Sequence, residues 1–107
     1  MIAASTRTLI AASRPRPLVW PAKDPSEVID YAIDFTERLD DDTISSATFS
    51  LVTAAGLTIS ASDFCGPVSS VTLSGGNEGS KGKILCRLVT TDGRTLDETV
   101  ALPIRSR

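Results

Sequence analysis

The chain has 107 residues, of which 41% are hydrophobic and 22% are charged, and this is the composition of one ordinary globular domain. No apolar run approaches the ~20 residues that a membrane-spanning helix needs, so a membrane protein is not expected. The formal net charge of −2 argues against general affinity for nucleic acid. The first seven residues lack a charged start followed by a long apolar stretch, so no secretory signal is expected.

Charge is distributed unevenly along the first 42 residues. Residues 1–23 carry three arginines and one lysine and no acid, whereas residues 24–42 carry eight acids against Arg38 alone. Such an asymmetry is compatible with head-to-tail contact between copies, and equally with two solvated surfaces.

Residues 1–19 are expected to form an extended N-terminal arm, and residues 20–107 the folded domain. The run Arg14-Pro15-Arg16-Pro17 disfavours both a helix and a central strand, because each proline lacks an N–H and biases the preceding residue toward extended geometry. The arm either lies along an edge of its own domain or reaches a neighbouring molecule.

From Val28 the sequence alternates with a period of two. Tyr31, Ile33 and Phe35 fall on one side and acids on the other, which is typical of a half-buried strand. A helix over residues 25–39 is the alternative, because the residues from Asp24 resemble a helix start, but the β-branched and aromatic alternation favours the strand. An acidic turn is expected over residues 39–43.

Further short strands follow at regular spacing. They are expected over residues 44–52, 57–62, 68–73, 82–91 and 95–104. The strand over 82–91 is apolar on both sides near its middle, so it should be central. In the third strand Leu57, Ile59 and Ala61 should face inward, and residues 63–67 should form a corner.

Turn signals separate these strands. Residues 74–80 should form a glycine-rich turn, and residues 91–94 a type I′ hairpin turn, because Asp92-Gly93 suits positive φ. The pattern predicts an all-β, immunoglobulin-like (Ig-like) sandwich of about seven antiparallel strands with an extended N-terminal arm. The cysteine pair and the tyrosine corner of immunoglobulin domains are not recognisable in it.

The residues that usually carry chemistry are few. The chain has no histidine, and Cys65 and Cys86 fit no zinc pattern, so they are expected to be two buried apolar thiols, with a disulfide as the alternative. The run Ser74–Gly79 lacks the lysine of a phosphate loop, and Asp40–Asp42 lacks the ligand spacing of a calcium loop. The sequence therefore predicts neither an enzyme nor a cofactor or metal site.

Residues for an assembly interface are more plausible. Leu9 and Ile10 are apolar in a segment that the core does not require, and exposed apolar residues there need a partner. Arg7, Arg14 and Arg16 would then meet an acidic surface. Trp20 is either a cap on the core or an interface anchor, since tryptophan is enriched in binding hot spots.

Two stretches resemble a family of small tailed-bacteriophage structural proteins described as fibre–tail adaptor or neck-region proteins. They are Trp20-Pro21-Ala22-Lys23-Asp24-Pro25 and Asp30-Tyr31-Ala32-Ile33-Asp34-Phe35. Later turns at Leu73–Gly76 and Thr90–Arg94 are similar as well. The resemblance covers roughly residues 20–105, and residues 1–19 lie outside it.

The resemblance implies an Ig-like virion protein that joins the neck or tail to fibres or to neighbouring structural proteins. Its partners would be other phage structural proteins, with several copies in a symmetric assembly formed in the host cytoplasm, and with no nucleic acid or membrane as a partner. The alternative is a carbohydrate-binding or host-surface-binding module on the same fold. Such sites usually need exposed aromatic side chains, and most aromatics here are predicted to face inward.

Overall fold

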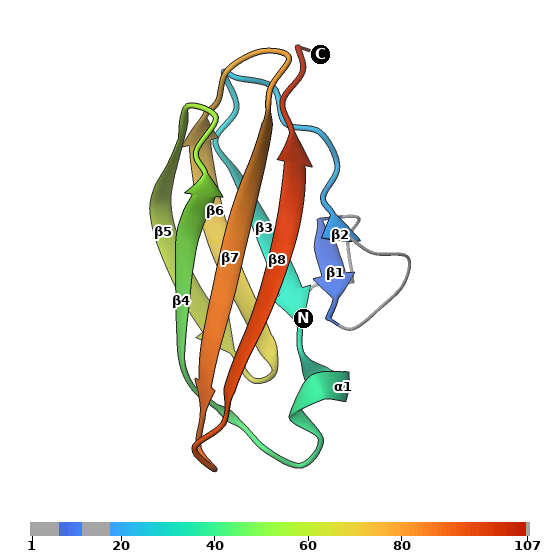
Figure 1. The fold of residues 1–107 in the computed structure, drawn as a ribbon, viewed down its shortest axis with the longest axis vertical. Helices are drawn as coiled ribbons and strands as arrows, with labels where there is room; N and C mark the ends of the chain where they lie inside the picture. Colours follow the sequence, from blue (N-terminus) through green and yellow to red (C-terminus); the bar gives the residue numbers. More distant parts are fainter. Residues whose placement is uncertain (1–6, 12–17, 107) are drawn as a thin grey trace.

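A computed structural model describes residues 7–11 and 18–106, and these form a β-sandwich (Figure 1). One four-stranded sheet has the order β1-β3-β6-β5 and the other the order β2-β8-β7-β4. The elements are β1 (Thr8–Ile10), β2 (Leu18–Val19), β3 (Ile29–Asp34), α1 (Thr36–Leu39), β4 (Ile44–Thr53), β5 (Leu57–Cys65), β6 (Val68–Gly75), β7 (Lys81–Thr90) and β8 (Thr95–Pro103). The predicted all-β sandwich is confirmed, and β7 is a central strand as expected. No helix within the described residues is long and apolar enough to cross a membrane.

The segment predicted to be an arm contributes two edge strands. β1 pairs in parallel with β3, and β2 pairs in parallel with β8, whereas the pairs among β3 to β8 are antiparallel. The sequence left open whether the arm lies along an edge of its own domain or reaches a neighbouring molecule. Residues 8–10 and 18–19 lie along edges of their own domain. The domain boundary at residue 19 itself stays a prediction.

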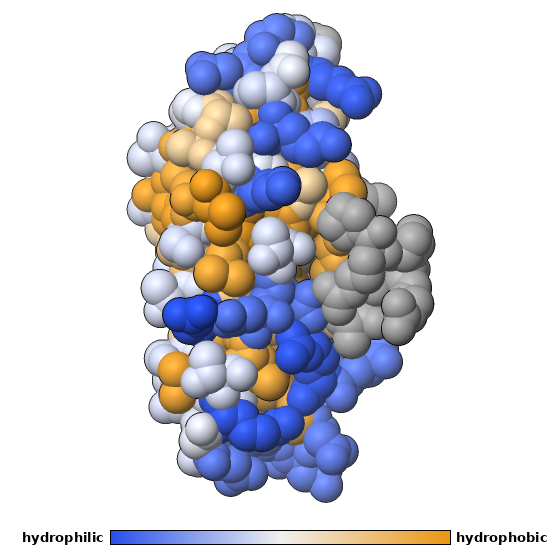
Figure 2. Space-filling view, viewed as in Figure 1, coloured by the Kyte–Doolittle hydropathy of each residue, from blue (hydrophilic) through white to orange (hydrophobic). Residues whose placement is uncertain are grey.

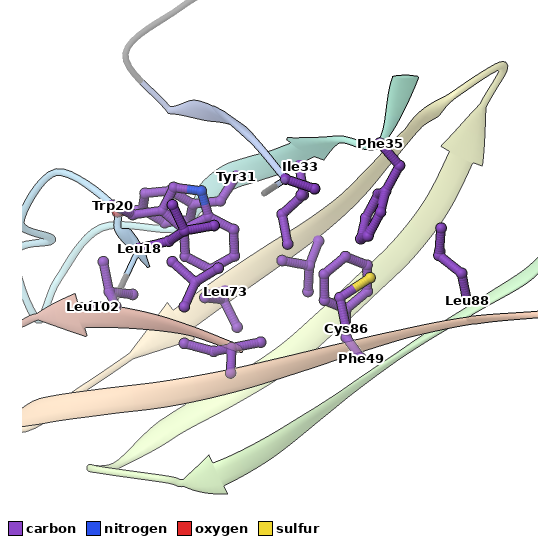
Figure 3. Packing of buried hydrophobic residues seen from close by; sticks show 14 of the residues in the cluster. Leu18, Trp20, Tyr31, Ile33, Phe35, Phe49, Leu73, Cys86, Leu88 and Leu102 are labelled. Atoms are coloured by element: carbon purple, nitrogen blue, oxygen red, sulfur yellow. The ribbon is translucent and has the colours of Figure 1, made fainter. Parts of the chain in front are cut away.

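The core lies between the two sheets (Figure 3). Tyr31 and Ile33 of β3 and Ile84 and Cys86 of β7 belong to this core, and each of these side chains is fully buried. A strand places alternate residues on one face. The apolar residues that recur with a period of two in the sequence therefore fill the layer between the sheets. Turns connect the long strands at each of the two ends of the sandwich.

One strand departs from the predicted alternation. The pairing of β5 with β6 shifts between Ile59 and Ala61, so Ser60 forms a bulge. An extra residue moves every following side chain to the opposite face. The prediction that Ala61 faces inward is therefore wrong: Ala61 is exposed, and Phe64 is partly buried instead. The strand also continues through Cys65, so the corner is only Gly66 and Pro67.

The two cysteines differ. Cys86 is buried, and burial raises the pKa of its thiol to about 11. Cys65 is exposed at the end of β5, and both thiols are free. The prediction of two buried thiols is wrong for Cys65, because the bulge at Ser60 turns that residue outward.

The predicted type I′ hairpin turn is also wrong. The amide of Thr90 donates to the carbonyl of Arg94 (2.9 Å), and the amide of Gly93 donates to the carbonyl of Thr90 (3.0 Å). Only Gly93 in this turn has a positive φ, 89°. These bonds define a three-residue loop in which a type I turn is followed by a left-handed glycine.

Candidate functional site

Those predicted interface residues that the structure describes lie on or beside the two N-terminal edge strands, and only some are accessible. Arg7 is bonded to Asp30 of β3, through the carbonyl (2.8 Å from Nε) and the carboxylate (3.5 Å). Leu9 is half-buried and packs against the core, whereas the side chain of Ile10 is 47% exposed. Arg14 and Arg16 lie outside the described residues.

Trp20 is a core residue. Its side chain is 1% exposed, its ring centroid lies 4.9 Å from that of Tyr31, and its Nε1 donates to the carbonyl of Ala32 at 3.1 Å. Figure 3 shows the two rings together at one side of the cluster. Of the two roles left open by the sequence, the structure places Trp20 in the core-capping one.

A hollow of about 350 Å³ lies at the end of the sandwich that carries α1. Its lining comes from three places: the end of α1, the start of β4, and the corner between β5 and β6. We call it the apolar groove, and it is lined by Leu39, Asp42, Thr43, Ile44, Phe64, Gly66 and Pro67. Phe64 of β5 supplies the aromatic ring of this lining. The bulge at Ser60 turns its side chain toward the groove.

A second, more polar hollow shares Leu39 and Asp42 with the apolar groove. Its other lining residues are Asp40, Asp41, Asp92 and Arg94. Asp40, Asp41 and Asp92, which we call the acidic rim, are all exposed. Arg94, the one cation in this lining, is bonded to Asp42 and to the carbonyl of Leu39, so the lining of the hollow carries an excess of negative charge.

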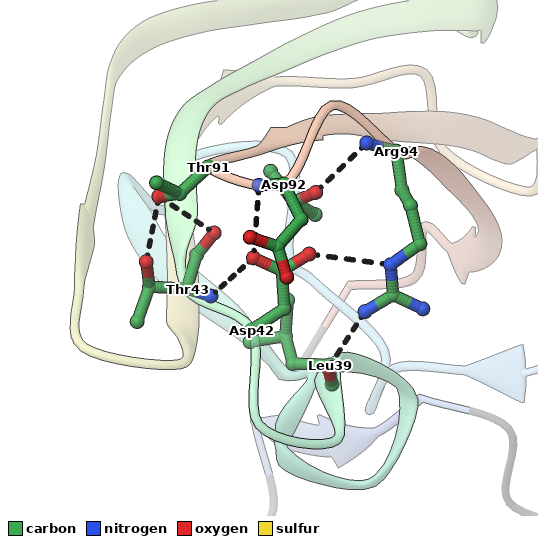
Figure 4. Close-up of polar contacts among 7 residues, drawn as sticks. Leu39, Asp42, Thr43, Thr91, Asp92 and Arg94 are labelled. Carbon is green, nitrogen blue, oxygen red and sulfur yellow. Dashed lines mark hydrogen bonds and ion pairs between the residues drawn. The ribbon is translucent and has the colours of Figure 1, made fainter.

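Asp42 fixes the shape of this end (Figure 4). Its carboxylate accepts hydrogen bonds from the amides of Thr43 (2.8 Å) and Asp92 (3.1 Å) and from Nε of Arg94 (3.2 Å). The pKa of Asp42 lies below its ordinary value. The largest cause is a hydrogen bond from the Thr90 side chain, and the three bonds above act in the same direction. The ionised carboxylate of Asp42 therefore links the α1–β4 turn to the β7–β8 hairpin. This link holds the groove in its shape before any partner binds.

Sequence reasoning missed two buried charged side chains. Glu98 follows the inward alternation of β8 between Leu96 and Val100, and its carboxylate is bonded to Arg38 at 2.9 Å. Lys23 is fully buried and its Nζ donates to the carbonyls of Gly75 (2.6 Å) and Asp24 (2.9 Å). Burial lowers the pKa of Lys23 from its ordinary value. Both residues join separate segments of the chain, so their roles are structural.

The described residues hold no group of three or more side chains suited to a metal ion. What this end offers instead is an apolar hollow beside fixed negative charge. Such a surface can receive an apolar side chain of a protein partner with a lysine or arginine next to it.

A family model with the description "Podophage GP4 fiber-tail adaptor protein gp77" matches residues 23–103. No curated protein matches the sequence. Among solved structures, the solution structure of the PKD domain from the KIAA 1837 protein is similar, with a TM-score of 0.54 and 14% identity over 91% of this chain and 92% of that chain. The likeness shows the fold, an Ig-like sandwich.

Proposed function

The chain belongs to the podophage GP4 fiber-tail adaptor family gp77, and we propose that it joins the tail or neck of a phage particle to fibres or neighbouring structural proteins. The observation that carries the proposal is the extent of the family match, which covers β3 through β8 and the whole of the apolar groove. In this role the sandwich is a rigid body, its surfaces make protein–protein contacts, and no catalytic step is involved. The protein then resides in the virion, after assembly in the host cytoplasm.

The apolar groove with its acidic rim is the contact surface that we favour. Its lining residues lie in or beside turns, and turns on a rigid scaffold are where binding residues are most often found. Apolar lining beside Asp40 and Asp41 suits a partner segment that presents an apolar side chain flanked by lysine or arginine. The network around Asp42 lowers the ordering cost of binding, because the groove is formed in advance.

The N-terminal edge is a second contact surface in this proposal. Ile10 on β1 and Val19 on β2 are the large apolar side chains exposed there, at 47% and 45%. Arg7 adds a cation beside them. Leu9 and Trp20 pack inward, so they would support this surface from behind without touching a partner.

Binding of carbohydrate or of a host surface finds no support in the aromatic residues. Trp20, Tyr31, Phe35 and Phe49 are buried, and Phe64 is partly buried in the apolar groove. A glycan site usually stacks sugar rings on exposed aromatic faces, and the described residues present no such face.

We expect Asp41→Lys to reduce incorporation of this chain into phage particles by about tenfold or more, since a like charge set against a basic partner is strongly unfavourable. Asp41 is exposed and lines the polar hollow, so the stability of the free protein should not change. The measurement is the amount of the chain in purified particles, by quantitative immunoblotting, after complementation of a phage that lacks the gene.

Glu37→Lys is the matched control. It makes the same change of charge on α1, but Glu37 is exposed and lines neither hollow. Normal incorporation of both variants would remove the acidic rim from the proposal, whereas an equal defect in both would indicate a general effect of net charge.

A further inference from the structure

Long open edges of both sheets lie on one side of the sandwich. β4 is the edge of one sheet, β5 is the edge of the other, and the short turn Ala54–Gly56 connects them. On the opposite side the edges are β1 and β2, which have 3 and 2 residues, against 10 residues in β4 and 9 in β5. The edges β1 and β2 are protected by their shortness from pairing with other strands. The edges β4 and β5 are long, so their exposure needs another explanation.

This side is almost free of charge. Residues 43–77 contain one charged residue, Asp63, although 22% of the whole chain is charged. Proteins usually block an open edge with charged side chains, especially lysine, or with proline. Neither β4 nor β5 contains a lysine, an arginine or a proline, so the features left to discourage pairing are Asp63, the bulge at Ser60 and the register shifts at Ser45 and Val52 of β4.

The exposed side chains here are small or apolar. Ser60, Ala61 and Ser62 are exposed one after another on β5, and Val52 on β4 is 59% exposed. Figure 2 shows mostly pale and orange residues along the side where β4 and β5 lie, whereas blue residues are mixed with pale and orange ones over β7 and β8 and are more continuous at the lower end. Depletion of charge is the compositional mark of the centre of a protein–protein interface.

We propose that a second copy of this chain covers the β4–β5 side, with β5 pairing antiparallel to β5 of the second copy. In a two-fold interface each patch meets itself, so any charge near the axis would face its own copy and repel it. Self-pairing therefore requires an edge with little charge, and β4 and β5 carry only Asp63, which lies two residues from Ala61 at the middle of β5. A binding surface for a charged partner would carry the complementary charge instead. The small side chains at Ser60–Ser62 allow the two backbones to approach closely.

The size of β5 is sufficient for this contact. Nine residues at a rise of about 3.3 Å extend over roughly 30 Å, and pairing would satisfy the outward N–H and C=O groups on either side of the bulge at Ser60. Addition of a strand to an open edge is an established mode of protein recognition, in which main-chain hydrogen bonds supply much of the affinity. The β1-β3-β6-β5 sheets of the two copies would join into one continuous sheet.

Sedimentation equilibrium of the full chain from micromolar to millimolar concentration tests this inference. We expect the apparent mass to rise from the chain mass of 11.3 kDa toward twice that value. Ser62→Lys places two like charges in the paired edge and should raise the dissociation constant at least about tenfold. Thr99→Lys is the matched control, because Thr99 is exposed but lies on β8, an interior strand of its sheet.

The wild-type chain remaining monomeric at every concentration would overturn the inference, and so would a dimer that Ser62→Lys and Thr99→Lys leave equally intact. A second measurement needs no edge variant: a nitroxide on the exposed thiol of Cys65, with Cys86 buried and unlabelled, reports the distance between copies by pulsed electron paramagnetic resonance. One narrow intermolecular distance is expected from a two-fold pair. A broad distribution or no dipolar signal would contradict it.

Discussion

Trp20→Ala should lower the free energy of unfolding by about 3–5 kcal/mol, the usual cost of truncating a buried aromatic side chain. The substitution removes a fully buried ring that packs on Tyr31 and a hydrogen bond to the carbonyl of Ala32. Small domains are stable by only about 5–15 kcal/mol, so this single change would bring the protein close to unfolding. Urea denaturation followed by circular dichroism measures the effect.

Val28→Ala is the control for that substitution. Val28 is also apolar but is 66% exposed, so its truncation should change the unfolding free energy by less than about 0.5 kcal/mol. If the two variants unfold at the same urea concentration, Trp20 does not belong to the core, and its role as an interface anchor has to be considered again.

Arg38→Ala is expected to cost about 2–4 kcal/mol, because removal of one member of a buried ion pair leaves the other charge in a poorly solvated position. The Glu98 side chain is 2% exposed and lies 2.9 Å from the guanidinium of Arg38. Arg38 also donates to the carbonyl of Asp97 at 2.7 Å. The pair connects α1 to β8, so its loss should loosen the end of the sandwich that forms the apolar groove.

The charge of Glu98 can be separated from its packing. Arg38→Ala with Glu98→Gln should recover part of the lost stability, because the neutral amide has the same shape and a smaller cost of burial. Both variants are compared by urea denaturation at neutral pH. A cost below about 0.5 kcal/mol for Arg38→Ala would mean that this contact behaves as an ordinary surface ion pair.

The strands from β3 to β8 were predictable because each carries a long enough alternation of apolar and polar residues. β1 and β2 were not, because strands of 3 and 2 residues leave no periodic pattern, and the same residues suit an extended arm. The bulge at Ser60 has no local signal either. It moved Ala61 and Cys65 outward and Phe64 toward the groove, so the errors in that strand share one physical cause.

The candidate site was predictable only in its parts. Asp40–Asp42 is recognisable in the sequence as an acidic turn, but its closeness to the β7–β8 hairpin and to Phe64 depends on the packing of the sheets. Glu98 and Lys23 escaped notice because patterns of burial are read from apolar residues, while these charges are buried with partners that lie far along the chain. Long-range pairing of this kind has no signature in one sequence.

In the proposed function, the apolar groove and its acidic rim form the contact surface within the phage particle. Hydrogen exchange of the backbone amides, compared between the free protein and the assembled particle, tests it most directly. We expect the amides of residues 39–44 and 64–66 to exchange at least about tenfold more slowly in the particle, whereas those of β1 and β2 should be protected in both states. Unchanged exchange at residues 39–44 and 64–66, with new protection elsewhere, would contradict the proposal.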